Sequence, residues 1–167
     1  PILAEEAFAR LPNHAPPAPE SGRYVGGEHR EDRDLEQAHL VLGFESVGMH
    51  DPDHYAHAVY STLLGGGMSS RLFQEVREKR GLTYGIGTGL ASRDLSAEWV
   101  GQFQASNDKV AEAIQVVRDE WAKMATEGVT AEELATAKTY MTGAYPLRFD
   151  GNGQIASILV GMQMLGL

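Results

Sequence analysis

The sequence predicts an α+β fold, a two-layer sandwich in which helices pack on one face of a mostly antiparallel sheet. Residues 23–45 and 82–106 show the side-chain alternation of strands, and each stretch is followed by one with helical spacing, residues 51–81 and 110–145. The short turn "SRDLS" inside the second strand stretch suits a hairpin, which makes those two strands antiparallel. We therefore expect the order β-β-α-α-β-β-α-α-α.

Residues 1–22 are expected to lie outside this domain. "ILAEEAFARLP" has helical spacing and reads as the end of a helix, and residues 12–22 hold four prolines, which fix φ and favour extended backbone. The domain is then expected to run over residues 23–167. Since "ASILVGMQMLGL" is still apolar where the sequence stops, we expect a piece of a longer polypeptide, with the domain cut short at its C-terminus.

The first strand pair is expected at "RYVGGEH", residues 23–29, and at "EQAHLVLGFES", residues 36–46, the second with both faces largely buried. A helix should follow, with Asp51 as its N-cap and Pro52 at its first helical position. Its apolar face is expected to run through the helically spaced side chains Tyr55, Ala58, Val59, Thr62 and Leu63 until three glycines end it.

A second helix is expected to begin at Ser69 or Ser70 and to end at Gly81, with Leu72, Phe73 and Val76 turned inward. In the strand "LTYGIGTGLA" after it, the large residues occupy even positions, Leu82, Tyr84, Ile86 and Leu90, and the odd positions are small. We expect this small face to permit close approach by another backbone or a helix. The next strand, "SAEWVGQFQAS", should have one drier and one wetter face.

Two long helices complete the expected fold. The first has one apolar stripe, formed by Val110, Ile114, Val117, Trp121 and Met124. The second begins with a capping box, in which Thr130 and Glu133 satisfy each other's backbone N–H groups. Pro146 should end or kink that helix, and a last apolar helix should follow "DGNGQ".

Charge and composition exclude several classes of function. The chain has 167 residues, 43% of them hydrophobic, and a net charge of -9, so its field repels nucleic acid and anionic membranes. No apolar run reaches the roughly 20 residues of a membrane span. The absence of cysteine removes disulfides and thiolate chemistry but selects no compartment. A soluble protein of the bacterial cytoplasm or periplasm, or of the mitochondrial matrix, fits this composition.

The histidine cluster "HDPDHYAH" is the first metal candidate. His50, His54 and His57 lie close in sequence with Asp51 and Asp53, but the start of the helix already explains the aspartates, so solvated polar residues are the favoured interpretation. "GGEH" lacks the first histidine of H-x-x-E-H, and H-E-x-x-H is absent. We expect no metal site in this chain.

The glycines of "LGGGMSS" suggest a phosphate-binding loop, but the lysine of a P-loop and the G-x-G-x-x-G spacing are missing. The segment lies between two predicted helices, so a turn between helices is the favoured interpretation.

Arg77 and Tyr84 are the remaining candidates for chemistry. The reversal at Gly81 can bring a helix-end arginine against a tyrosine in the third position of the next strand. A guanidinium and a phenol are hydrogen-bond donors suited to carbonyl oxygens and oxyanions. The alternative interpretation gives the two residues no functional role. Arg77 is then one surface charge among Glu78, Lys79 and Arg80, and Tyr84 is a core aromatic.

"LLGGGMSSRLFQEVREKRGLTYGIG", with "EWVGQFQAS" and "TAEELATAKTYMTGAY", resembles the second half-domain of the M16 zinc peptidases, the family of mitochondrial processing peptidase, pitrilysin and the insulin-degrading enzymes. The resemblance runs from about Gly27 to Leu167. It implies a peptidase unit of two similar α+β halves, and two such units forming a chamber. Residues 1–22 would then come from the preceding half-domain, and residues 23–167 would be the zinc-less, C-terminal-type half.

The resemblance also implies the chemistry. The zinc motif H-x-x-E-H would lie in the first half-domain of a unit, and the family's arginine–tyrosine pair falls on Arg77 and Tyr84. Both would be catalytic and substrate-binding residues. Tyr84 would donate a hydrogen bond to the scissile carbonyl oxygen as it becomes an oxyanion, and Arg77 would hold the peptide or position the phenol.

The partners implied are a peptide or unfolded polypeptide substrate, the preceding half-domain, and a zinc-bearing M16 unit in a homo- or heterodimer. Zinc would be supplied by the parent enzyme or by a partner subunit. Either the rest of the parent carries its own zinc motif, or the parent is a zinc-less subunit that serves a partner. A non-catalytic structural or assembly subunit of the core-protein type is the rival class. This chain alone is expected not to hydrolyse peptides.

Overall fold

A three-stranded antiparallel sheet forms one layer of the domain, with the strands in the order β1-β3-β2. The computed structural model describes residues 2–12, 17–18, 20–93 and 95–167. Its elements, in chain order, are α1 (Ile2–Phe8), β1 (Gln37–Glu45), α2 (His54–Gly65), the π-helix η1 (Phe73–Glu78), β2 (Ile86–Ser92), β3 (Ala97–Ser106), α3 (Val110–Glu127), α4 (Ala131–Ala144), the 3-10 helix η2 (Tyr145–Phe149) and α5 (Asn152–Leu165).

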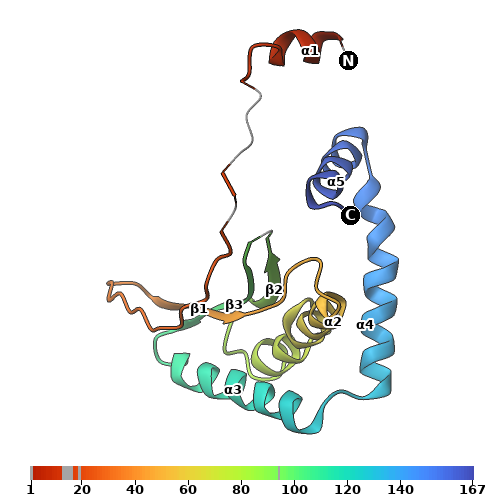
Figure 1. Ribbon diagram of the computed structural model, residues 1–167. Helices are drawn as coiled ribbons and strands as arrows, with labels where there is room; N and C mark the ends of the chain where they lie inside the picture. The colour runs from red at the N-terminus through yellow and green to blue at the C-terminus, as the bar shows by residue number, and fades with distance from the viewer. Residues whose placement is uncertain (1, 13–16, 19, 94) are drawn as a thin grey trace.

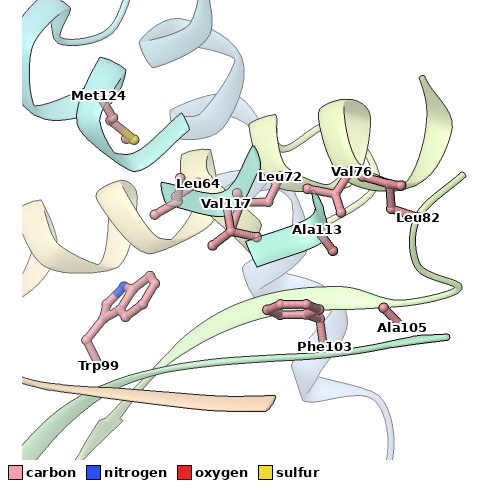
Figure 2. Packing of buried hydrophobic residues seen from close by; sticks show 10 residues of the cluster. All are labelled: Leu64, Leu72, Val76, Leu82, Trp99, Phe103, Ala105, Ala113, Val117 and Met124. Atoms are coloured by element: carbon pink, nitrogen blue, oxygen red, sulfur yellow. The ribbon is translucent and has the colours of Figure 1, made fainter. Parts of the chain in front are cut away.

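Helices cover one face of the sheet, which confirms the predicted α+β sandwich. Figure 1 shows α2 and α3 on the same side of the strands, and α4 leading away to α5. The buried faces of β3, η1, α2 and α3 meet between these two layers (Figure 2). The core they form consists of Leu64, Leu72, Val76, Leu82, Trp99, Phe103, Ala105, Ala113, Val117 and Met124.

The central strand β3 is fixed by its register with both neighbours. Trp99 pairs with Phe44 of β1 and with Leu90 of β2, so all three point to the helical side. The Trp99 ring meets Trp121 of α3 edge-on, with 4.5 Å between ring centroids. Residues of β3 alternate between buried and more exposed, which confirms the predicted drier and wetter faces.

The strand predicted at residues 23–29 is absent, since this segment is extended but joins no strand. Two consecutive glycines and a charged continuation give it no apolar face to bury, and backbone flexibility opposes pairing. One anchor is the Tyr24 hydroxyl, which donates a 2.8 Å hydrogen bond to the Gly43 carbonyl of β1.

The prediction that β1 is buried on both faces is also wrong. β1 is an edge strand covered on one side only, so Leu40 and Leu42 are half-buried whereas Val41 is 73% exposed. A continuous apolar run in the sequence does not reveal how many layers cover a strand.

The predicted cap at Asp51 forms, but it lies about one turn before the first residue of α2. The Asp51 carboxylate accepts a 2.9 Å hydrogen bond from the Asp53 N–H, the bond expected of an N-cap, although α2 itself begins at His54. The predicted inward stripe is shifted, because α2 buries His54, Ser61 and Leu64, whereas Tyr55 is 76% exposed.

α2 approaches β2 closely at the even position Thr88 and also on the predicted small face, where a Cβ atom added at Gly87 would lie 3.5 Å from the Gly65 carbonyl oxygen. A Cβ atom added at Gly65 would lie 2.6 Å from the Thr88 methyl carbon, and Thr88 is an even position of the strand. The Thr88 hydroxyl donates to the Ser61 carbonyl over 2.8 Å. A Cβ added at Gly89, on the small face, would meet no atom within 4 Å.

The C-terminal helices agree with the sequence. α3 buries the predicted stripe, and α4 begins with both hydrogen bonds of the Thr130–Glu133 capping box. α4 ends at Ala144, Pro146 lies in η2, and α5 follows as the apolar helix. α1 confirms the predicted N-terminal helix.

Several predicted features fall partly on positions outside the described residues. These are Pro1 of the first helix, residues 13–16 and 19 of the proline-rich segment, and Asp94 of the hairpin turn. The Arg93 N–H donates to the Ser96 carbonyl over 2.9 Å, and β2 and β3 pair as the predicted hairpin.

Candidate functional site

The chain reverses at Gly81, and this reversal creates the candidate site. Gly81 has φ +59°, a left-handed conformation that favours glycine. Its N–H donates to the Arg77 carbonyl over 2.9 Å, and the Leu82 N–H donates to the Val76 carbonyl over 3.0 Å. The Gly81–Arg77 bond is the bond of an αL helix end, and together with the Leu82–Val76 bond it ends the helix and reverses the chain.

The helix ending here is a π-helix, which the sequence did not predict. The Lys79 N–H donates to the carbonyl of Gln74, five residues earlier, over 2.9 Å. Leu72 and Val76 of this region are buried, as predicted. Phe73 was predicted to point into the core, but its ring lies against the Arg77 guanidinium instead. Short π-helical turns are frequently found at functional sites.

The chain bends at Tyr84, and this side chain lies outside the sheet. The Thr83 hydroxyl oxygen accepts from the Gly85 N–H over 3.2 Å, and it lies within hydrogen-bond distance of the Gly85 and Gln104 carbonyls, to either of which it can donate. The predicted strand therefore starts only at Ile86, and Tyr84 precedes it. Leu82 is buried, but Tyr84 is 80% exposed, so it is not the core aromatic of the alternative interpretation.

The Arg77 guanidinium contacts two aromatic rings. Its central carbon lies 4.6 Å from the centroid of the Phe73 ring and 5.1 Å from that of the Tyr84 ring. Such cation–π contacts restrain the side chain while leaving in-plane N–H groups for other partners. Among the described residues, its ion-pair partner is Glu78, at 3.6 Å between Nη1 and Oε1, which is longer than a hydrogen bond.

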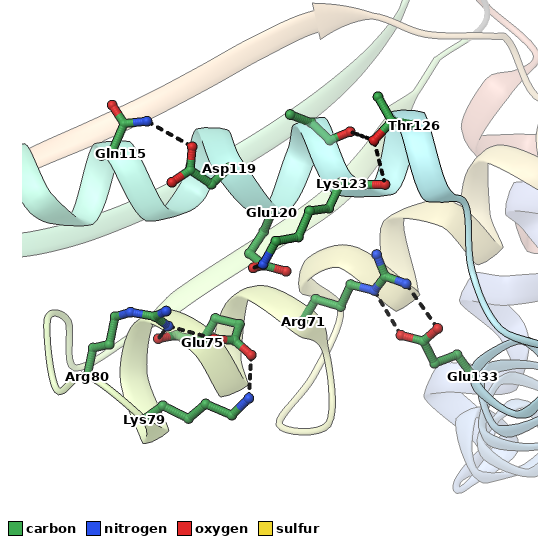
Figure 3. Close-up of polar contacts among 11 residues, drawn as sticks. Arg71, Glu75, Lys79, Arg80, Gln115, Asp119, Glu120, Lys123, Thr126 and Glu133 are labelled. Atoms are coloured by element: carbon green, nitrogen blue, oxygen red, sulfur yellow. Dashed lines mark hydrogen bonds and ion pairs between the residues drawn. The ribbon is translucent and has the colours of Figure 1, made fainter.

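The neighbouring cations are engaged differently. Arg80 donates to the Glu75 carboxylate over 2.6 Å and Lys79 contacts the same group, as Figure 3 shows. Hydrogen bonds from Lys79 and Arg80 lower the pKa of Glu75 below its ordinary value. Arg77 thus differs from the flanking cations: it lies beside exposed Tyr84 and outside the Glu75 cluster.

A second ion pair connects Arg71, which lies just before η1, to Glu133 of α4. Arg71 donates to both carboxylate oxygens of Glu133, over 2.8 and 3.0 Å (Figure 3). It also donates to the Gly128 carbonyl over 3.0 Å. The hydrogen bond from Arg71 and the backbone N–H of Thr130 lower the pKa of Glu133 from 4.5 to about 2. The sequence indicated the cap but not the arginine, which is far away in the chain.

The histidine cluster is only partly the solvated group predicted. His50, Asp51 and Asp53 are exposed. His54 is buried, with no hydrogen-bond partner at Nδ1 among the described residues, and the Nδ1 atom of His57 lies 3.1 Å from the Ser46 hydroxyl. Within residues 2–12, 17–18, 20–93 and 95–167, no group of three or more histidine and acidic residues is arranged to hold a metal ion.

The glycine segment is a turn between helices, as predicted. The Ser70 N–H and hydroxyl both donate to the Gly67 carbonyl, and the Gln74 side chain donates to the Met68 carbonyl over 2.7 Å. This turn and α4 border a groove of about 560 Å³.

Phe73 and Thr83 were missed as contributors to the site. Phe73 precedes Arg77 by four positions, a spacing that places side chains side by side on a helix, and this signal was available. The role of Thr83 depends on its contact with Gln104 of β3, which no local pattern reveals.

The structure is thus a three-stranded antiparallel sheet covered on one face, with a half-buried arginine beside an exposed tyrosine at the end of a helix. The chain belongs to the peptidase M16 family: residues 3–141 match the family model described as the peptidase M16 inactive domain. This confirms the family indicated by the sequence.

The curated relatives are bacterial. The chain is 36% identical over 151 residues to an uncharacterized zinc protease of Streptomyces coelicolor, covering 86% of this chain and 32% of the relative. It is 35% identical to one of Mycobacterium leprae, covering 87% and 33% of the two chains. The chain therefore spans about a third of the length of the curated relatives it matches.

Solved structures agree with the fold. The peptidase M16 inactive domain from Pseudomonas fluorescens matches with a TM-score of 0.72 at 30% identity, covering 80% of this chain and 31% of that one. A chain of Complex III2 from Candida albicans matches with a TM-score of 0.80 at 18% identity, covering 98% and 42%. The second likeness shows the fold alone.

Proposed function

We propose that this domain is the zinc-less half of an M16 protease and that it presents Arg77 and Tyr84 to a peptide held at a zinc centre elsewhere in the protein. The observation that supports this role is the contact of the Arg77 guanidinium with both the Phe73 and the Tyr84 ring, with the tyrosine 80% exposed. Restrained, accessible donors are suited to a carbonyl oxygen on which negative charge develops.

The proposed roles of the zinc centre and of this domain follow from the residues present. Zinc, supplied by another half-domain or subunit, would polarise the scissile carbonyl and activate water. In this chain, the Tyr84 hydroxyl would donate a hydrogen bond to the oxyanion, and Arg77 would hold a peptide carbonyl and restrain the phenol ring. Residues 23–167 would form this half-domain, and residues 1–22 would connect it to the preceding half.

The test is a Tyr84→Phe substitution in the complete protease, with Tyr55→Phe as a matched control. Tyr55 is 76% exposed and lies on α2, so loss of its hydroxyl should leave turnover unchanged. Loss of the Tyr84 hydroxyl should lower kcat by about 10²–10³, the usual effect of removing one oxyanion donor. Zinc content, measured by atomic absorption, should stay constant.

Turnover of the Tyr84→Phe protein equal to that of the control would reject the catalytic role. If the complete protein has no peptidase activity even with Tyr84 intact, the rival interpretation as a structural or assembly subunit is favoured. Adding a zinc-bearing M16 partner separates this outcome from a subunit that works only in a heterodimer.

A further inference from the structure

α5 carries no charge and is mainly apolar, although it lies on the surface of the domain. Asn152–Leu165 contains no charged residue, and none of its residues is buried. Its polar residues are Asn152, Gln154, Ser157 and Gln163. Figure 1 shows α5 beyond the end of α4, away from the three strands. An uncharged helix whose larger side chains are mostly apolar is usually covered on more than one side.

One side of α5 is half-covered and the other is open. The half-covered side carries Ile155, Ile158, Met162 and Leu165. On the other side, Gly153, Ser157, Val160 and Met164 share one face by their helical spacing. Val160 is 53% and Met164 78% exposed, and a Cβ atom added at Gly153 would meet nothing within 4 Å. We call these four residues the outer face of α5.

The outer face combines small and larger side chains, as surfaces between packed helices do. Gly153 and Ser157 leave a shallow notch beside the larger Val160 and Met164, and a ridge of side chains from a second helix fits such a groove at close distance. Three further exposed apolar side chains lie nearby in η2 and α5, namely Tyr145, Leu147 and Leu159.

A lipid bilayer is a poor partner for this surface. α5 has 14 residues, fewer than the roughly 20 that span a bilayer, and no helix in the described part of the chain is long and apolar enough to cross one. A helix lying on a membrane surface carries a basic polar face, and α5 has no lysine or arginine.

We propose that the outer face of α5 packs against a helix from the part of the same M16 polypeptide that lies outside these residues. The chain spans about a third of its curated relatives, so a longer parent has ample sequence to supply such a helix. Covering Val160 and Met164 would give α5 the burial that its composition requires. The proposal does not depend on the roles of Arg77 and Tyr84.

The test uses thiol labelling, because this chain has no cysteine. Met164→Cys is made in the complete polypeptide, and modification by a maleimide is followed at that peptide by mass spectrometry. Met68→Cys is the matched control, since Met68 is 74% exposed and lies in the turn after α2. We expect Cys labelling at position 164 to be slower than at position 68 by about tenfold or more, because a packed helix must open before it reacts.

Equal labelling rates at the two positions would overturn the proposal. Protection that disappears on dilution would also overturn it, in favour of a second copy of the chain as the occupant. Protection that persists at every protein concentration supports packing within one molecule. Val160→Cys gives an independent reading on the same face should Met164→Cys impair folding.

Discussion

The guanidinium carbon of Arg77 lies 5.1 Å from the centroid of the Tyr84 ring, although a helix end, a left-handed glycine and a bend separate the two residues. Each intervening feature has an identifiable cause: Gly81 reverses the chain, buried Leu82 anchors it, and the Thr83 hydroxyl bends it. The proximity of the pair is therefore a property of the whole connection, and each part of that connection can be tested.

Phe73→Leu should leave the Arg77 side chain less restrained, because it removes one of the two rings that the guanidinium contacts. We expect peptide turnover of the complete protease to fall by a smaller factor than in Tyr84→Phe, because a single cation–π contact contributes only about 0.5–2 kcal/mol. Phe73→Tyr keeps the ring and should retain turnover. Steady-state kinetics of the three proteins checks this, and identical kinetics for Phe73→Leu and the unchanged protein would contradict it.

Thr83→Val keeps the shape of the side chain but removes the hydroxyl that bends the backbone. The Gly85 N–H and the carbonyl that accepts from the hydroxyl, that of Gly85 or of Gln104, then lose a partner, and we expect a loss of about 1–3 kcal/mol in the free energy of unfolding. Thr83→Ser, which keeps the hydroxyl, is the control. Chemical denaturation measures both, and a Thr83→Val protein as stable as the serine variant would show that the bend does not need this group.

Gly81→Ala tests the left-handed turn without a packing effect, since an added Cβ atom at Gly81 meets nothing within 4 Å. The cost should be about 1 kcal/mol, from backbone conformation alone. Gly67→Ala is the comparison, because Gly67 is equally open and has no positive φ. Equal thermal unfolding temperatures for the two variants would rule out strain at Gly81.

Glu133→Gln removes the charge that pairs with Arg71 while keeping an amide able to complete the capping box. The pKa of Glu133 is lowered to about 2, so the carboxylate contributes stability above its ordinary pKa of 4.5 and loses it as the pH falls toward 2. Since the pair is partly exposed, we expect about 1 kcal/mol at pH 7. Unfolding curves from pH 7 to pH 2 should converge for the two proteins, and a pH-independent difference would contradict this origin.

The sequence predicted the elements whose signals are local. The stripe of α3, the Thr130–Glu133 cap and the glycine end after Arg77 all depend on neighbours a few residues away. It failed where a distant group decides the outcome. Val41 is exposed because no described residue covers that side of the sheet, and the strand predicted from Leu82 begins only at Ile86, after Thr83 contacts Gln104 of β3. The strand predicted at residues 23–29 failed because two glycines remove the side chains that would secure its pairing.

The pair was predicted from its spacing and from the family resemblance, and the structure brings the two residues together. The exposure of Tyr84 required coordinates, since the sequence left open whether Tyr84 was a site residue or a core aromatic. For His54 the prediction erred in the other direction. A polar residue at the start of a helix is expected to be solvated, but His54 of α2 is buried.

The π-helical turn has a consequence for how this segment tolerates changes in length. In η1 a carbonyl bonds the N–H five residues on, so the turn holds one residue more than an α-helical turn would. Deleting a residue between Phe73 and Arg77 would let this turn relax to α-helical winding and would place the aromatic ring and the guanidinium three positions apart instead of four. The contact between these two side chains therefore depends on the number of residues in one helical turn.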